Sequence, residues 1–225
     1  MIIESYRAAR PDGSYPHIVI DSINLQRLIE LVTGSRLDEL ATYLAEALAR
    51  LAAAGADVAL LASNTPHLVF DELRRRSPVP LISIVEAACA ATRAMGVTRV
   101  ALFGTRFTME ARFYPDVFEA GGIALMVPSA EEREYIHGRY MDELIHGRFL
   151  SQTREAMTSI VDRLVERHAV QAVVLGGTEL PLLFRDGPPL RVPLLDTMRI
   201  HAARAVAVML ATLTDATAPR IRNGR

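Results

Sequence analysis

Short apolar runs alternate along this chain with longer stretches whose apolar residues recur every three or four positions. The short runs are typical of buried strands, which we predict at 17–20, 58–62, 80–84, 99–103, 123–127, 173–175 and 192–195. The longer stretches predict helices at about 36–54, 85–95, 130–146, 151–168 and 198–213. Strands and helices in alternation predict an α/β fold built on mostly parallel sheets.

Two of the predicted strands end in similar polar turns. The run 173–175 breaks into Gly176, Gly177, Thr178 and Glu179, and the run 58–62 is followed by Ser63, Asn64 and Thr65. Ligands of open α/β sheets bind beyond the carboxyl ends of the strands. We therefore expect these two turns, here called the first tip (residues 63–65) and the second tip (residues 176–179), to be halves of one site.

A third strand end carries residues suited to binding an anion. Gly104 follows the run 99–103, and Thr105 and Thr108 stand at the start of the next predicted helix. Free backbone N–H groups at such a helix start favour a negatively charged ligand. The sequence thus predicts a small, anionic ligand near these hydroxyls.

The repeated plan of strand, tip and helix favours two pseudo-symmetric lobes, each a mostly parallel sheet flanked by helices, with the site in a cleft between them. No long linker divides the chain. We place residues 1–98 and 199–225 in the N-terminal lobe, which the last helix completes, and residues 99–198 in the C-terminal lobe.

Charge and hydropathy narrow the class of partner. The formal net charge is −1 and charged residues make up 23% of the chain, which favours neither nucleic acid nor a membrane surface. No apolar run approaches the length of about 20 residues that spans a bilayer, and the chain does not open with a secretion signal. We expect a cytoplasmic protein whose partners are small molecules or other copies of itself.

The basic residues exclude two chemistries. All 25 are arginine, whereas a pyridoxal-phosphate enzyme needs a lysine for its Schiff base and a Walker A loop needs one for its phosphates.

The single cysteine, Cys89, lies among alanines in a predicted helix, which is typical of a buried core residue. His137 and His146 have no further ligand nearby, so we expect no metal.

Several motifs, in their order and spacing from about residue 16 to 210, together resemble the aspartate/glutamate racemase family. They are Ser63-Asn64-Thr65-Pro66-His67, Gly104-Thr105-Arg106-Phe107-Thr108-Met109-Glu110 with Phe113-Tyr114, Glu143-Leu144 with Gly147, Gly176-Gly177-Thr178-Glu179-Leu180, and Pro193-Leu194-Leu195-Asp196-Thr197 with Ile200-His201. The resemblance implies cofactor-independent chemistry on a small carboxylate or amino acid, such as aspartate or glutamate, held between two α/β lobes. It also implies a pair of cysteines, one on each tip, that remove and return a proton on opposite faces of the α-carbon.

This sequence departs from the family pattern at both of those positions. The pattern has Cys-Asn-Thr at the first tip and Gly-Cys-Thr-Glu at the second, whereas Ser63 and Gly177 stand here. A thiol titrates near pH 8.5, roughly, and can be activated further; serine is far less acidic and glycine has no side chain. Ordinary two-cysteine racemisation is therefore not expected.

Three interpretations remain open. The protein is a diverged isomerase or lyase that uses the same site for another reaction, or an inactive homologue that binds a carboxylate for regulation. The third is a sequence in which serine was introduced as a near-isostere of cysteine, against which the glycine at position 177 argues.

The resemblance and the tips together give a set of candidate residues. The candidates for catalysis are Ser63, Gly177, Thr178 and His67. The candidates for substrate binding are Ser22, Asn64, Thr65, Thr105, Thr108, Gly176 and Glu179. Each has a structural alternative, since residues of these types also cap helices, form turns or satisfy buried polar groups.

The histidines differ in their expected roles. His67 lies at a predicted helix start, where the helix dipole lowers the pKa of an imidazole and favours a neutral, hydrogen-bonding ring. His201 is expected to be packed, with Asp196 or a backbone group as its partner.

The start of the chain is the second departure from the family. Family members open with a glycine-rich first strand, whereas this sequence begins with what resembles the helix that follows it. Either the first strand is missing from the sequence or the lobe is pared down. The sheet of the N-terminal lobe would then present an open edge, which favours a homodimer that covers it.

Overall fold

The computed structural model describes the backbone of residues 1–217 and the side chains of residues 1–211. The tail predicted at 215–225 lies mostly outside this part of the chain. Residues 215–217 belong to the last helix, α11 (Thr197–Thr217), which therefore extends beyond the predicted end at 213.

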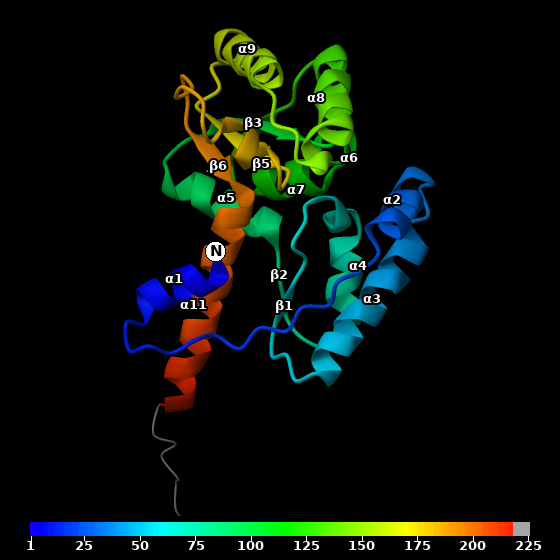
Figure 1. Cartoon of the computed structure of the whole chain (residues 1–225), viewed down its shortest axis with the longest axis vertical. Coiled ribbons are helices and arrows are strands. Elements are labelled where there is room, and N and C mark those ends of the chain that lie inside the picture. The colour runs from blue at the N-terminus through cyan, green and yellow to red at the C-terminus, as the bar shows by residue number, and fades with distance from the viewer. Residues whose placement is uncertain (218–225) are drawn as a thin grey trace, which may run out of the picture.

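One half of the molecule is built around a four-stranded parallel sheet (Figure 1). Its strands, in spatial order, are β4 (Ala124–Met126), β3 (Arg99–Gly104), β5 (Ala172–Gly176) and β6 (Leu194–Asp196). Strands β3 and β5 pair from Val100 and Ala172 through to Gly104 and Gly176. All five residues of β5 are buried, as expected of a parallel strand whose faces are both covered and whose sequence is therefore continuously apolar.

Helices cover this sheet on both faces. Residues of α8 (Ala130–Asp142) and α9 (Ser151–His168) share one core cluster with the sheet. Residues of α5 (Ile84–Ala94) and α7 (Phe113–Ala120) share the other. The predicted start of α8 is confirmed in detail, because Ser129 and Glu132 form a reciprocal capping box there.

The other half contains a two-stranded parallel sheet of β1 (Ala59–Leu60) and β2 (Leu81–Ile82). Its core is shared with α2 (Leu25–Thr33), α3 (Leu37–Ala53) and α4 (Phe70–Arg76). The predicted stripe on α3 is confirmed at Leu40, Leu44 and Leu48, which are at most 2% exposed.

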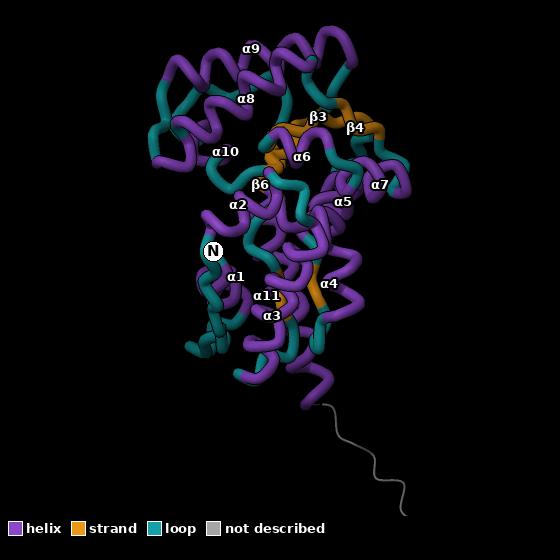
Figure 2. The backbone as a smooth tube through the Cα atoms, turned by 90° about the vertical axis from the view of Figure 1, so that its right-hand side faces the viewer, coloured by secondary structure: helices purple, strands orange, loops and turns teal. Residues whose placement is uncertain are grey.

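Helix α11 begins at the end of β6 in the four-stranded half and runs along the other half, past α1, so that it connects the two halves (Figures 1 and 2). It packs on α5 and on the first helix, α1 (Ile2–Ala9). His201 of α11 bonds through Nε2 to the carbonyl oxygen of Ile82, at 2.9 Å. His201 is therefore packed and has a backbone partner, as predicted. None of the described helices is both long and apolar enough to cross a membrane.

The predicted strand at 17–20 is wrong. These residues lie in an extended segment without regular structure, and among the described strands none pairs with them. Ile18, Val19 and Ile20 are 39, 50 and 82% exposed. An apolar run forms a strand only where a neighbour supplies the ladder of hydrogen bonds, and this one has no such neighbour. Helix α2 was not predicted, whereas α1 corresponds to the helix expected at the start of the chain.

Candidate functional site

The first tip is fixed against the carboxyl end of the large sheet by a buried hydrogen-bond network. Asn64, 2% exposed, accepts a hydrogen bond from the Tyr114 hydroxyl at 2.7 Å. Its amide donates to Thr197 Oγ1 at 3.3 Å, and Thr197 in turn donates to the carbonyl oxygen of Leu175 at 2.7 Å. This path joins the first tip to β5, just before the second tip.

A row of threonine hydroxyls crosses from one half of the molecule to the other. Thr65 Oγ1 lies 3.4 Å from Thr105 Oγ1, which lies 3.2 Å from Thr108 Oγ1. Thr105 is also the N-cap of the five-residue helix α6 (Arg106–Glu110), where it accepts from the Thr108 N–H. These predicted residues are therefore brought together at the end of β3.

The glycines at the ends of β3 and β5 make room for this row. A Cβ on Gly104 would lie 2.8 Å from the Gly176 carbonyl oxygen, and one on Gly176 would lie 2.9 Å from Thr108 Cγ2. Both distances are shorter than any ordinary contact of a Cβ atom. The absence of a side chain at Gly176 therefore allows Thr108 to approach the backbone closely.

His67 orients the first tip. It lies in the 3₁₀ turn η1 (Thr65–Val69), is 2% exposed, and stacks on Phe70 at 4.6 Å between ring centroids. The Ile84 N–H donates to Nε2 at 3.2 Å, so Nδ1 carries the proton and donates to the Ser63 carbonyl oxygen at 3.1 Å. Burial, and secondarily His201, lowers the pKa of His67 to about 3.

The ring is accordingly neutral at physiological pH, and both its nitrogens are occupied by backbone partners. The structure thus shows His67 as a neutral, hydrogen-bonding ring, as predicted. Acid–base exchange with a ligand is not available to this geometry, because no lone pair or proton of the ring is free.

The second tip is completed by a residue of α8. The Tyr140 hydroxyl donates to Glu179 Oε2, and the Thr178 hydroxyl donates to the same oxygen. Tyr140 is 5% exposed, whereas Thr178 and Glu179 are half-buried. Burial is the main cause that raises the pKa of Tyr140, followed by the neighbouring carboxylate.

Gly177 lies directly beside this tyrosine. A Cβ on Gly177 would lie 2.6 Å from Tyr140 Cε2 and 2.8 Å from its hydroxyl oxygen. The volume that a side chain at position 177 would take is thus filled by Tyr140.

Ser22 lies apart from the first tip and from the second tip. It is exposed in the loop before α2, and among the described residues it makes no hydrogen bond to either tip. Its neighbour Asn24 has a structural role, since its side chain caps α2 by accepting from Arg27 N–H.

Sequence reasoning missed Tyr140, and it gave no role to Tyr114 and Thr197, although both stand in the motifs that carry the family resemblance. Tyr140 follows Ile136 and precedes Leu144 at helical spacing, so its pattern is that of an ordinary core residue. The glycine at a tip where the family pattern has a larger residue was the one signal that something else fills the space.

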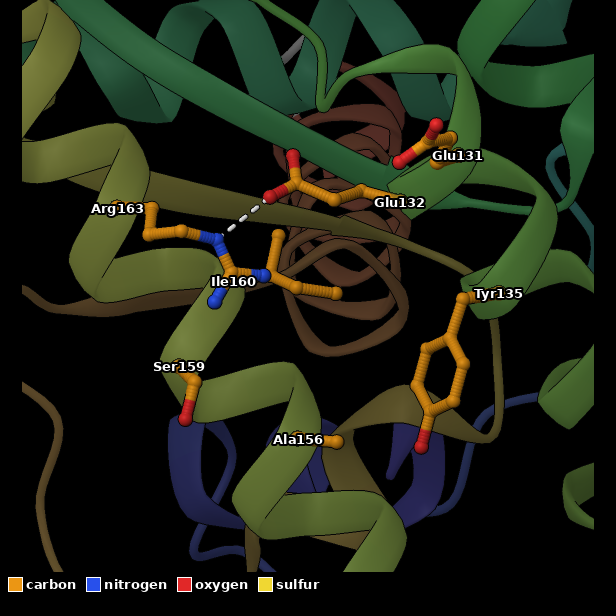
Figure 3. Close-up of a pocket in the computed structure, with 7 residues that line it drawn as sticks. All are labelled: Glu131, Glu132, Tyr135, Ala156, Ser159, Ile160 and Arg163. Atoms are coloured by element: carbon orange, nitrogen blue, oxygen red, sulfur yellow. Dashed lines mark hydrogen bonds and ion pairs between the residues drawn. The ribbon is translucent and has the colours of Figure 1, made fainter.

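Two further features lie away from the tips. The Cys89 thiol is free, and burial raises its pKa; it packs in the core beneath the sheet. A cavity of about 280 Å³ opens between α8 and α9, lined by Glu131, Glu132, Tyr135, Ala156, Ser159, Ile160 and Arg163 (Figure 3). Two of its charged groups, Glu132 and Arg163, form an ion pair at 2.7 Å.

No group of three or more histidine, cysteine, aspartate or glutamate side chains is arranged to hold a metal ion in the part of the chain that the structure describes.

Residues 1–205 match the sequence model of a family described as Asp/Glu/Hydantoin racemase. The chain belongs to this family. A solved structure of a candidate Asp/Glu racemase from Yersinia pestis is 29% identical, with a TM-score of 0.84 over 93% of this chain and 90% of that one. An aspartate racemase homologue from Pyrococcus horikoshii is 31% identical, with a TM-score of 0.76 over 93% and 92%.

More distant racemases share the fold alone. Glutamate racemase from Francisella tularensis, solved in complex with D-glutamate, is 14% identical, with a TM-score of 0.63 over 95% of this chain and 77% of that one. The mixed α/β fold with parallel sheets flanked by helices is therefore that of the Asp/Glu/hydantoin racemases.

Proposed function

We propose that this member of the Asp/Glu/hydantoin racemase family binds a small carboxylate or amino acid, such as aspartate or glutamate, between its two tips. The observation that carries the proposal is the row of hydroxyls formed by Thr65, Thr105 and Thr108, which spans the two halves at the carboxyl end of β3. Neutral donors of this kind stabilise a carboxylate where water is excluded.

The chemistry proposed is cofactor-independent proton transfer at the α-carbon, in an isomerase or lyase reaction that differs from two-cysteine racemisation. Ser63 and Gly177 take the positions that the family pattern gives to cysteines, so neither tip carries a thiol. Removal of the α-proton leaves an electron pair that the adjacent carboxylate delocalises, and the hydroxyls would hold that carboxylate.

A second function, binding without turnover, is favoured by the same two residues. Gly177 has no side chain, and serine is a weak acid and a weak base at neutral pH. We retain a carboxylate-binding or regulatory homologue as the alternative.

Ligand-induced stabilisation tests the binding proposal. At 100 times its dissociation constant, a ligand stabilises the folded state by about 2.7 kcal/mol, which raises the melting temperature of a domain this size by roughly 5–10 °C. We expect this from at least one of L-aspartate, D-aspartate, L-glutamate and D-glutamate, and a smaller shift in Thr65→Val. Thr33→Val, at an exposed helix end, is the matched control. A wild-type protein that none of the four stabilises would overturn the proposal.

Solvent exchange separates the two functions. In D2O, an enzyme of the proposed kind replaces the α-proton of a bound amino acid with deuterium, which NMR detects. Binding without exchange would support the alternative.

We also propose a homodimer and a cytoplasmic location. The apolar side chains of Ile18, Val19 and Ile20 are exposed on the extended segment before α2, and a second copy of the chain would remove such a surface from water. Light scattering should then give twice the monomer mass, and Ile20→Asp should weaken association where Ala120→Asp, at an exposed position of α7, does not. A monomeric wild-type protein would contradict this.

The division into residues 1–98 with 199–225 and residues 99–198 is likewise a proposal. Helix α5, although it precedes residue 99, packs on the four-stranded sheet, so the two halves share core between them.

A further inference from the structure

Tyr140 reaches the second tip from a distant part of the sequence. It lies on α8, and its ring is packed in the core cluster with Ile136, Leu144 and Met157. A side chain on Gly177 would begin 2.8 Å from its hydroxyl oxygen. The phenol thus lies where a residue with a side chain at position 177 would place its first atoms.

The hydroxyl of Tyr140 is also chemically connected. It donates to Glu179 Oε2, which accepts from Thr178 as well. A packing role alone would be served by phenylalanine, and it would not need a carboxylate partner. Two donors on one carboxylate oxygen fix the orientation of Glu179 at the tip.

We propose that Tyr140 and Glu179 form the proton-transfer pair of the second tip, in place of a side chain on residue 177. The inference rests on the proposed function and deepens it. Tyr140 would contact the substrate, and Glu179 would act through Tyr140.

The step balances without any other reactant. The C–H bond at the substrate α-carbon breaks, and its proton passes to the Tyr140 oxygen while the Tyr140 proton passes to Glu179 Oε2. The electron pair remains on the substrate and is delocalised into its carboxylate. The reverse transfer, with a deuteron in D2O, returns the substrate to its starting configuration.

The opposite face of the substrate has no equivalent group. The hydroxyl of Ser63 stays protonated at neutral pH, and both ring nitrogens of His67 are hydrogen-bonded to backbone groups. Exchange is therefore expected on one face, so that one enantiomer exchanges its α-proton with retention and its mirror image does not exchange.

The experiment measures deuterium incorporation into L-aspartate, D-aspartate, L-glutamate and D-glutamate separately, with chiral chromatography to detect inversion. Tyr140→Phe keeps the ring and removes the oxygen, and we expect exchange to fall about 100-fold or more. Glu179→Gln can still accept the tyrosine hydrogen bond but takes up no proton, so a similar loss is expected. In both variants the stabilisation by the amino acid should remain within about twofold in affinity, well below the effect of a lost charged contact.

Tyr135→Phe is the matched control. Tyr135 lies on the same helix but lines the cavity between α8 and α9 (Figure 3), so its variant should exchange at the wild-type rate.

The outcomes distinguish this inference from the function on which it rests. Exchange that persists in Tyr140→Phe would overturn the pair and leave the proposed function intact. Stabilisation of the wild type without exchange would overturn the pair and favour the binding alternative. Inversion as well as exchange would show a working group on the first tip and would overturn the one-face pair. If none of the amino acids stabilises the wild type, the proposed function fails and the pair fails with it.

Discussion

The contact between Gly177 and Tyr140 predicts that alanine at position 177 destabilises the protein. Gly177 is not among the glycines with a positive φ, so the backbone itself accepts an L residue there. Where nothing else intervenes, glycine to alanine stabilises a fold by about 0.4–1 kcal/mol, because the unfolded chain loses freedom. The sign of the change at position 177 is therefore decided by the neighbouring ring.

The magnitude follows from the geometry. The new Cβ would lie 2.6 Å from Tyr140 Cε2, whereas carbon atoms in contact prefer about 3.5–4.0 Å. The buried ring must therefore move by roughly 1 Å, and overpacking of this kind costs about 1–3 kcal/mol. Movement also disturbs the hydrogen bond from Tyr140 to Glu179, and bonds to charged groups contribute about 1.5–3 kcal/mol. We expect a net loss of about 2–4 kcal/mol.

Urea unfolding of a double-mutant cycle measures this. Tyr140→Leu removes the ring atoms that clash, so Gly177→Ala should cost little in that background, and the coupling energy should be close to the wild-type cost of about 2–4 kcal/mol. Tyr140→Phe keeps Cε2 and Cζ and should rescue little. The matched glycine control is Gly138→Ala on α8, where a Cβ would meet nothing within 4 Å and alanine should stabilise by up to about 1 kcal/mol.

Two results would refute the reasoning. The first is a Gly177→Ala variant as stable as the wild type, and the second is equal rescue by Tyr140→Phe and Tyr140→Leu. A cysteine at position 177, the residue that the family resemblance implies there, would meet the same ring, so introducing it requires a smaller residue at position 140 as well.

Three further predictions concern stability. The pKa of His67 is lowered from 6.5 to about 3, so between these pH values the unfolded chain binds a proton that the folded protein does not. The free energy of unfolding should therefore decrease as the pH falls below 6.5, by about 2 kcal/mol at pH 5. Equal urea midpoints at pH 7.5 and pH 5 would contradict this. Tyr114→Phe leaves the buried Asn64 Oδ1 without its donor and should cost about 1–3 kcal/mol by thermal or urea unfolding, so a neutral result would exclude a structural role for that bond. Gly104→Ala places a Cβ 2.8 Å from the Gly176 carbonyl oxygen. Because the backbone of a paired strand cannot rotate away, the substitution should lower the free energy of unfolding by about 3 kcal/mol or more. A smaller loss than that of Gly177→Ala would show that the paired strands move apart more easily than the Tyr140 ring moves.

The local pattern of the sequence predicted most of the regular structure. The predicted helices of the second half agree with α8, α9 and α11, and the apolar run 173–175 lies in β5. Periodicity succeeds there because each element buries one face or stripe, and that burial is written into neighbouring residues. It failed at 17–20, where an apolar run has strand character but no neighbour to pair with.

The tips were also recognisable from the sequence, because glycines and hydroxyl residues after an apolar run reflect a local need for close approach and capping. Their mutual arrangement was not. The sequence gives no spacing that relates Thr65 to Thr105, whose hydroxyls meet only because the two halves pack together.

By itself, then, the sequence determined the α/β class, the positions of the tips and the absence of a thiol from both of them. Only the tertiary structure decided what surrounds those positions. It placed His67 between two backbone groups and Tyr140 in the volume beside Gly177. Contacts of this kind join residues of different elements, and they depend on how the elements pack rather than on any period along the chain.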